Sequence, residues 1–301
     1  MEIQQLRVLV SVVEEASFTA AARRLHLTQS GVSRAISNLE KEVGLTLLER
    51  SRSGVRPTEP GERVLAHART SIASIEAIHQ EVSALYGLER GSVKVGAFPS
   101  VCSTLLPSLI AQFETQYPGV RVDLSEGWSV EVLGWLEDRA IDVGFVGLPL
   151  DEPEARRIET FPVVRDRMVT VVSTGHPLAG SPKAGELQRL EDEPFILPRG
   201  HHEAIISEIL ADAGVRPRVR FKVRDANSIL AAVEQGLGWS VVNEMSIPIT
   251  ATGVHYTLVV PAVEHEVGMA VRASLQLSPA VETFTRFAKM ILLSRDASTS
   301  A

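Results

Sequence analysis

The chain has 301 residues, a length that suits about two domains, and its formal net charge of −7 argues against a uniformly basic nucleic-acid binder. Hydrophobic residues make up 45% of the chain, yet no run supplies the roughly 20 apolar residues that cross a bilayer, so we expect no membrane partner. The single cysteine, Cys102, excludes an intramolecular disulfide and indicates a reducing, cytoplasmic location.

The excess acid lies in the C-terminal part, because residues 1–60 hold eight Lys and Arg against seven Asp and Glu. A near-neutral head can still bind a polyanion if its arginines gather on one face. The opening MEIQQLRVLVSVVEEASF lacks a basic n-region and a small-residue cleavage site. We therefore expect a helix of the mature chain here rather than a signal peptide.

Apolar spacing and capping residues predict three helices in this head, over residues 3–15, 17–25 and 29–43. Ser17 and Thr28 are predicted N-caps, because their hydroxyls can accept hydrogen bonds from free N–H groups of a first turn. Gly44 is expected to end the third helix. Only His26 and Leu27 separate the second helix from the third, which is the spacing of a helix-turn-helix.

The third predicted helix has one apolar and one polar face. At about 100° per residue, Val32, Ile36 and Leu39 fall in one narrow stripe. The opposite side carries hydroxyls, amides and an arginine, with no carboxylate in its first two turns. Such side chains can read base edges in a groove, and a merely solvated face is the alternative. The residues of this helix predicted to contact DNA are Gln29, Ser30, Ser33, Arg34 and Ser37.

A basic hairpin is expected next, with strands over residues 47–50 and 55–57 and Gly54 supplying the turn. Arginines in such a hairpin can lie along the DNA backbone or enter the minor groove. The three predicted contacts are Arg50, Arg52 and Arg56. The short turn, the polar helix and the basic hairpin together favour DNA binding over a solvated surface.

A long helix is predicted from Thr58, its N-cap, to about Tyr86. Its apolar residues step by three and four, the a/d spacing of a coiled coil. Such a seam needs a partner, which is either a second copy of the chain or another part of the same chain, and we favour dimerisation. The predicted contacts are Leu65, Ile72, Ile75 and Val82.

From residue 92 onward strands and helices alternate, which is typical of a mainly parallel α/β sheet. One set includes the strands SVKVGAF and IDVGFVG, and a second set runs from RMVTVVST to WSVVNE. Two sets predict two subdomains joined by crossing strands, with a cleft between them. We place subdomain I at about 92–163 and 267–301, and subdomain II at about 164–266. The tail DASTSA is expected to be disordered.

The segment SFTAAARRLHLTQSGVSRAISNLEKEVGLTLLERSRSGVRPTEPG closely resembles the N-terminus of LysR-type transcriptional regulators, and GSVKVGAF, IDVGFVG, HPLAG and EQGLGWSVV extend this resemblance along the chain. The resemblance implies an α+β multi-domain protein. Its parts would be a winged helix-turn-helix over 1–58, a dimerisation linker helix over 59–88, and an α/β, two-subdomain effector domain, like periplasmic binding proteins, over 92–301.

The resemblance also implies a function. Members of this family are transcription regulators rather than enzymes, bind a double-stranded DNA operator and a small effector, and are usually dimers of dimers. RNA polymerase is a further candidate partner of such a regulator.

In open α/β sheets, ligands bind beyond the C-terminal strand ends, where several helices begin here. Converging helix N-termini favour an anion, typically a carboxylate. Arg199 can pair with a carboxylate and His202 can tune that contact with pH, although exposed loop positions are the alternative for both. The resemblance places Ser100 and Ser129 where effector-binding hydroxyls often sit, a role compatible with helix capping. The candidates are Ser100, Ser103, Ser129, Arg199, His202 and Asn227.

Four other features carry weaker interpretations. Cys102 has no resolving thiol, so we expect a buried apolar residue rather than a redox sensor. His201 and His202 lack a third ligand at sensible spacing, and we predict no metal site. EQGLGWS lacks a third glycine and a following helix, which argues against a dinucleotide site, and we expect no cofactor. Trp239 stands where the family often has a smaller aliphatic residue, so it shapes either the core or the cleft.

Overall fold

The computed structural model describes residues 1–51, 54–85, 91–150, 157–200, 203–248, 250–273 and 277–299. The chain forms two compact units. One is Met1–Gly91 with the short segments Glu137–Ala140 and Leu277–Ala280, and the other is the rest of the chain. No helix within the described ranges is both long and apolar enough to span a membrane.

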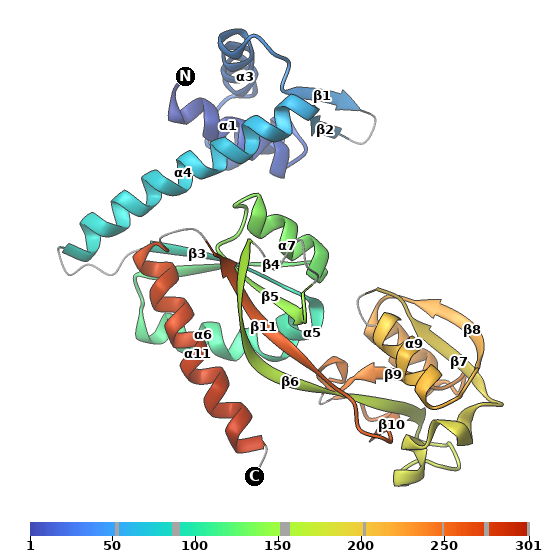
Figure 1. The fold of residues 1–301 in the computed structure, drawn as a ribbon. Helices are drawn as coiled ribbons and strands as arrows, with labels where there is room; N and C mark the ends of the chain where they lie inside the picture. The colour runs from blue at the N-terminus through green and yellow to red at the C-terminus, as the bar shows by residue number, and fades with distance from the viewer. Residues whose placement is uncertain are drawn as a thin grey trace. The chain divides into compact units, whose positions relative to one another are not determined.

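The first unit is a small helical head with a hairpin and one long helix (Figure 1). Its elements are α1 Ile3–Glu14, α2 Phe18–Arg24, α3 Gln29–Val43, β1 Leu48–Ser51, β2 Gly54–Pro57 and α4 Glu59–Leu85. Buried apolar side chains from all four helices, among them Leu9, Val32 and Leu39, form one core. The predicted helices and hairpin are therefore present, with ends within one residue of expectation, except that α4 is described only to Leu85.

Local capping chemistry explains where these helices begin and end. The Ser17 hydroxyl accepts a hydrogen bond from Ala20 N at 3.3 Å, and the Thr28 hydroxyl accepts one from Gly31 N at 3.1 Å. Gly44 ends α3 in the left-handed conformation with φ of 71°, which glycine adopts without strain. The predicted caps are confirmed.

Gly54 is required for a reason that the sequence did not indicate. It adopts φ of 115°, and a Cβ built there would lie 2.8 Å from the carbonyl oxygen of Ala16. The same carbonyl accepts a hydrogen bond from Val55 N at 3.0 Å. The hairpin is thus attached to the head by a close backbone contact, and Gly54 lies in β2 at that contact.

The long helix α4 uses part of its apolar seam within its own chain. Leu65 is 5% exposed and belongs to the core of the head, and Ile72 packs against that core. Farther along, Ile75 is half-buried and Val82 is 46% exposed. Leu65, a predicted dimer contact, is therefore covered by its own chain.

The second unit contains a sheet with strand order β10-β6-β11-β5-β3-β4, to which β9 adds by pairing with β6. A separate two-stranded parallel sheet joins β7 and β8. The strands are β3 Gly91–Ala97, β4 Val120–Glu126, β5 Val143–Leu148, β6 Ile158–Ser173, β7 Pro194–Pro198, β8 Arg218–Val223, β9 Ser240–Asn243, β10 Val254–Leu258 and β11 Glu264–Arg272. The helices and 3-10 turns are α5 Pro99–Thr104, α6 Leu106–Gln116, α7 Ser129–Glu137, η1 Pro182–Gly185, η2 Leu187–Leu190, α9 Glu203–Asp212, α10 Ala226–Glu234, η3 Glu244–Ser246 and α11 Pro279–Thr299.

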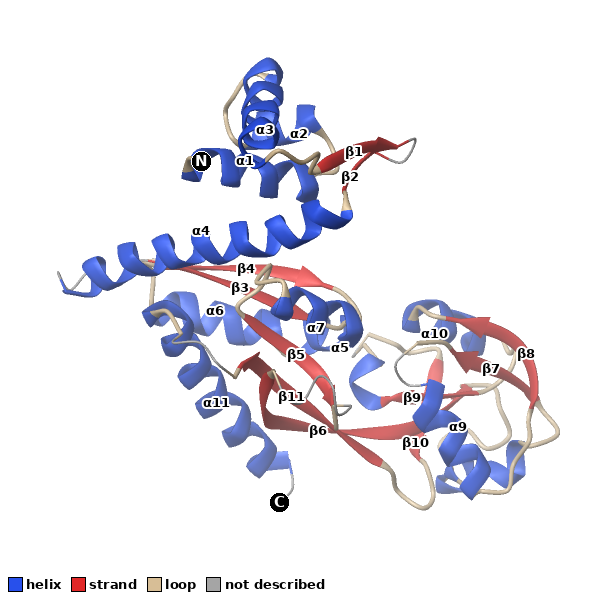
Figure 2. Ribbon diagram, turned by 45° about the horizontal axis from the view of Figure 1, so that its top comes forward, coloured by secondary structure: helices blue, strands red, loops and turns tan. Residues whose placement is uncertain are grey.

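Two long strands join the two halves of this unit, as predicted. β6 and β11 pair antiparallel from Glu264↔Arg167 to Arg272↔Ile158, and Figure 2 shows both running from one half into the other. We call the half with β3–β5, α5–α7 and α11 the first lobe, and the half with β7–β10, α9 and α10 the second lobe. Each lobe has its own apolar core.

Several details differ from the sequence-based expectation. The segment RMVTVVST is only the end of β6, which has 16 residues. The first half of β6 was not predicted as strand because it carries polar residues, which lie on a partly exposed face. The strand β10 and the six-residue helix α5 were not predicted. The tail expected to be disordered is helical as far as Thr299. Trp239 is 1% exposed, with its ring 4.6 Å from that of Phe195, so it shapes the core of the second lobe.

Candidate nucleic-acid interface and effector cleft

The polar face of α3 is open to solvent. Gln29, Ser30, Arg34 and Ser37 are exposed, whereas Ser33 is half-buried. On the opposite side Val32, Ile36 and Leu39 are buried, so α3 can present its polar face only outward from the head. The first turn of α3 carries no acidic side chain. N–H groups at such a helix N-terminus can bind an anion, for example a phosphate.

Of the three predicted hairpin arginines, Arg56 is the one whose side chain the structure describes. Arg56 is exposed on β2, and it lies directly opposite Glu49 of β1 in the antiparallel register. A carboxylate opposite an arginine reduces the local positive field. Arg50 lies on β1, but its side chain and the whole of Arg52 fall outside the described residues.

Two of the predicted cleft hydroxyls are buried in the first lobe. Ser100 is 7% exposed and Ser129 is 4% exposed. The Ser129 hydroxyl accepts a hydrogen bond from Gly147 N at 3.3 Å, which ties the start of α7 to the end of β5. Ser103 is exposed and donates to the Ser100 carbonyl oxygen at 3.1 Å. The Ser129 hydroxyl thus has a structural partner where the sequence placed a ligand site.

In the second lobe the predicted cation is already paired. Arg199 Nε lies 2.9 Å from Glu203 Oε2, four residues along the chain. Asn227 is exposed in the first turn of α10, which Asp225 caps by accepting from Ser228 N at 2.8 Å. These hydrogen bonds from Ser228 lower the pKa of Asp225. His202 falls outside the described residues.

The helix N-termini around the cleft also carry carboxylates of their own. Trp128 N donates to Glu131 Oε2 at 2.8 Å at the start of α7, just as Asp225 occupies the start of α10. Such capping uses N–H groups that an anionic ligand would otherwise bind. The anion preference expected from converging helix N-termini is therefore weakened at both helices.

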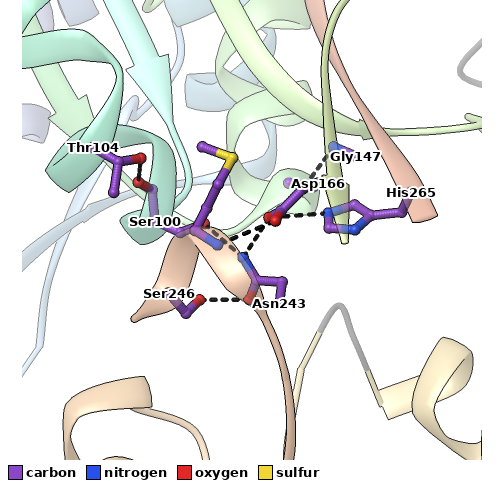
Figure 3. Close-up of polar contacts among 9 residues, drawn as sticks. Ser100, Thr104, Gly147, Asp166, Asn243, Ser246 and His265 are labelled. Atoms are coloured by element: carbon purple, nitrogen blue, oxygen red, sulfur yellow. Dashed lines mark hydrogen bonds and ion pairs between the residues drawn. The ribbon is translucent and has the colours of Figure 1, made fainter. Parts of the chain in front are cut away.

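A buried polar cluster joins the two lobes, and sequence reasoning did not find it (Figure 3). Asp166 of β6 is 2% exposed. Its Oδ2 accepts from Asn243 Nδ2 at 2.7 Å and its Oδ1 accepts from Met245 N at 3.1 Å. Asn243 Nδ2 also donates to the Ser100 hydroxyl at 3.3 Å, and His265 Nε2 lies 3.9 Å from Asp166 Oδ2. We call Ser100, Asp166, Asn243, Met245 and His265 the bridging cluster.

Burial changes the acidity of this cluster. Burial raises the pKa of Asp166 to about 6, against the opposing effect of its hydrogen bonds from Asn243 and Met245. Burial also lowers the pKa of His265 below its ordinary value of 6.5. Both shifts favour the neutral form of the side chain, because low-dielectric surroundings disfavour charge.

A close approach between two loops and a cavity outline the cleft. A Cβ built on Gly200 would lie 3.8 Å from the Trp128 ring, so the loop after β7 approaches the loop before α7. A cavity of about 520 Å³ lies beside the bridging cluster, lined mainly by the ends of β5 and β11 and by Ile205 of α9, with His265 as the shared residue. Its described lining contains none of Ser100, Ser103, Ser129, Arg199 and Asn227, the predicted effector residues that the structure describes.

Cys102 is poorly suited to redox sensing. Burial, with a smaller effect of Glu126, raises the pKa of its thiol to about 11. The sulfur donates weakly to the Ala97 carbonyl oxygen at 3.4 Å. Since the thiolate is the reactive form, a raised pKa disfavours oxidation.

The chain matches two family models, one described as the bacterial regulatory helix-turn-helix protein of the lysR family over residues 3–62 and one as the LysR substrate binding domain over residues 86–291. The chain belongs to the LysR family. It is a DNA-binding transcription regulator with an effector-binding domain, and it is not an enzyme.

Relatives of known sequence and structure agree with this LysR assignment. The HTH-type transcriptional regulator YvbU of Bacillus subtilis (strain 168) is 34% identical over 292 residues, which cover 96% of this chain and 98% of YvbU. Full-length OxyR of Pseudomonas aeruginosa has the same fold, with a TM-score of 0.72 at 23% identity, covering 97% of this chain and 94% of OxyR. Full-length CbnR complexed with its target DNA is similar with a TM-score of 0.66 at 25% identity, covering 96% and 99% of the two chains.

Proposed function

We propose that this LysR-type regulator binds its operator through the exposed face of α3 and the arginines of the hairpin. The carrying observation is that Ser30, Arg34 and Ser37 are exposed together on the side of α3 opposite its buried stripe, with Gln29 exposed at the N-terminal end of the helix. Arg34 has the fork that matches guanine in the major groove, and Gln29 matches adenine. Ser33, half-buried, is assigned to the edge of the contact.

The proposed division of the chain is a DNA-binding domain at 1–58, a linker helix at 59–88 and an effector domain at 92–301. Within the effector domain, subdomain I takes about 92–163 and 267–301, and subdomain II takes about 164–266. We propose a homodimer through the exposed part of the α4 seam, assembled into a tetramer. RNA polymerase is the further proposed partner, and the cytoplasm the proposed location.

The proposed effector is a small carboxylate in the cleft. Supporting this assignment are the hydroxyls of Ser100, Ser103 and Ser129 at the strand ends of the first lobe, and Arg199 and Asn227 in the second lobe. Arg199 remains 45% exposed in its ion pair with Glu203, so a ligand carboxylate can compete for its guanidinium. Solvent-exposed pairs of this kind contribute about 0–1 kcal/mol, which a charge-assisted contact with a bound ligand can replace.

DNA binding of the full chain tests the first proposal. We expect affinity for duplex DNA from its own promoter region to fall about 10³- to 10⁵-fold between roughly 50 and 200 mM salt if six to ten phosphates are contacted. Fluorescence anisotropy with labelled duplex measures this dependence. Salt-independent binding, or none, would contradict the assignment.

A thermal-shift screen of small carboxylates tests the effector proposal, because a ligand that binds only the folded chain raises the melting temperature. The expected hit stabilises the wild type and loses this effect in Arg199→Ala. Arg121→Ala is the matched control, since Arg121 is also an exposed arginine, with its guanidinium 2.6 Å from Asp123. A hit on uncharged analogues of equal size, unaffected by Arg199→Ala, would sink the carboxylate assignment and leave DNA binding untouched.

A further inference from the structure

The strand β8 and its flanks concentrate positive charge in an otherwise acidic domain. Residues 216–224 read RPRVRFKVR, with five Lys and Arg and no Asp or Glu, and we call this segment the basic strip. The rest of residues 92–301 holds 14 Lys and Arg against 26 Asp and Glu. All five cations of the strip are exposed, and none forms an ion pair with a residue that the structure describes.

Apolar side chains lie among these cations, and the strand has an open edge. Val219 is 42% exposed and Phe221 is 37% exposed, with the Arg220 guanidinium 4.9 Å from the centre of the Phe221 ring. Among the described strands β8 pairs only with β7, which leaves its other edge open. Charge alone protects an edge strand from wrong pairing, whereas exposed apolar side chains do not. Arginine beside an aromatic ring is instead typical of a protein–protein contact.

The first lobe has an edge strand of the opposite charge. β4 ends the strand order of the large sheet, and its Leu124 is 41% exposed. Glu126 of β4 is exposed, and exposed Glu114 of α6 reaches the same strand, since its Oε1 accepts from a backbone N–H of β4 at 3.4 Å. Neither carboxylate forms an ion pair within the described ranges, while Arg121 of β4 is neutralised by Asp123 at 2.6 Å. We call β4 together with Glu114 the acidic edge.

The basic strip and the acidic edge belong to different lobes, and both ribbon views show β8 and β4 well apart (Figures 1 and 2). An acidic partner of the strip is therefore a second molecule. Another copy of this chain offers such a surface, because residues 91–150 hold three Lys and Arg against seven Asp and Glu. Two copies related by a two-fold axis would make this contact twice, each strip meeting the other chain's acidic edge.

We propose that the basic strip of one chain binds the acidic edge of a second copy, and the reverse. This inference rests on the proposed tetramer, for which it supplies an interface separate from the α4 seam. The cations of β8 face Glu114 and Glu126 of the other chain, while Val219 and Phe221 pack against its Leu124. Duplex DNA suits the strip less well, because a phosphate backbone offers no apolar surface to these two side chains.

Charge reversal on either side tests the contact. Arg218→Glu with Lys222→Glu reverses the strip, and Glu114→Lys with Glu126→Lys reverses the edge. Each double variant alone sets like charges against each other at both contacts. In analytical ultracentrifugation of the full chain we expect each to lose one step of association, from tetramer to dimer or from dimer to monomer. The dissociation constant of that step should rise about a hundredfold or more.

Mixing the two double variants gives the sharpest result. In an equimolar mixture the reversed strip meets the reversed edge and the native strip meets the native edge, so association should return toward that of the wild type. A mixture that stays dissociated overturns the proposal. Wild-type association in either double variant alone, or a monomeric wild type, overturns it as well.

Lys183→Glu with Arg189→Glu is the matched control, because it reverses two exposed cations of the second lobe outside β8. Association should be unchanged in this control, and its loss would assign the effect to net charge and contradict the proposal.

DNA binding separates this inference from the proposed operator function. The reversed strip leaves α3 intact, so salt-sensitive binding to duplex DNA should be retained. Absence of DNA binding in the wild type and both variants would reject the operator proposal while the association result still decides the interface. Loss of DNA affinity in the reversed strip alone, with association unchanged, would assign β8 to DNA and overturn the inference.

Discussion

At the scale of single residues, Asp166 shows how the fold places adjacent charged residues in different environments. In the sequence it stands between Arg165 and Arg167, which suggests an exposed, mutually paired run. Successive side chains of a strand point to opposite faces, however, so both arginines turn outward to Glu266 and Glu244 while Asp166 turns inward. The carboxyl loses its apparent partners and titrates in a different pH range.

Stability should therefore depend on pH through this residue. The folded chain retains the Asp166 proton up to a pKa of about 6, whereas the unfolded chain loses it near 3.8. The free energy of unfolding contributed by this group is fully present below pH 3.8 and falls, by about 3 kcal/mol at most, as pH rises to about 6.

Chemical denaturation of the wild type and Asp166→Asn across this range measures that contribution. The comparison between the two proteins is needed because His265, whose pKa is lowered, acts in the opposite direction: its contribution is lost as pH falls below 6.5. Identical pH dependences in the two proteins would show that Asp166 is not shifted.

Arg34 is the side chain whose loss should most reduce sequence discrimination. Arg34→Ala is expected to cost about 1–3 kcal/mol in operator binding if the guanidinium forks onto a base, with little effect on unrelated duplexes. Arg56→Ala should weaken operator and unrelated duplexes alike, because a backbone contact carries no sequence information. Binding measured on both duplexes separates the two roles; equal losses for Arg34→Ala on both would place that residue on the phosphates instead.

At the scale of elements, α4 divides its apolar seam between two uses. Its first turns, with Leu65 and Ala68, complete the core of the head. Beyond them Val82 of the seam is 46% exposed, and Ile78 beside the seam is 61% exposed. Contact with a second copy of the helix would bury such apolar side chains. The seam is continuous in the sequence, and only the packed head shows where intramolecular contact stops.

Charges in the distal part of the seam should dissociate the proposed dimer. The double variant Ile75→Asp, Val82→Asp places two carboxylates where a coiled coil needs apolar contact, so we expect monomers by analytical ultracentrifugation. Ser74→Asp is the control, because Ser74 is exposed on the same helix. A dimer that survives the double variant would move the interface away from α4.

At the scale of the whole molecule, the two compact units have separate cores, so damage to one is expected to leave the other folded. Trp239→Ala removes a fully buried ring from the core of the second lobe and should cost about 3–5 kcal/mol there. Differential scanning calorimetry should show one transition at lower temperature while salt-sensitive DNA binding is retained. Loss of DNA binding in parallel would mean that the units unfold together.

The sequence by itself determined the features that depend on near neighbours. The caps at Ser17, Thr28 and Gly44, the two faces of α3 and the alternation of strands and helices follow from spacings of a few residues, and the structure agrees with them. The family was also identifiable, because its motifs are contiguous. Roles for individual DNA and effector contacts remain proposals.

Only the tertiary structure decided which distant side chains meet. Ser100 and Asn243 lie 143 residues apart, and nothing near either one indicates the hydrogen bond between them. The pairing of Arg199 with Glu203 reduced the positive charge expected in the cleft, and the burial of Asp166 created a titrating group that its sequence context concealed. Burial and long-range contact depend on how lobes and strands pack, and the physical chemistry of a short segment does not contain that information.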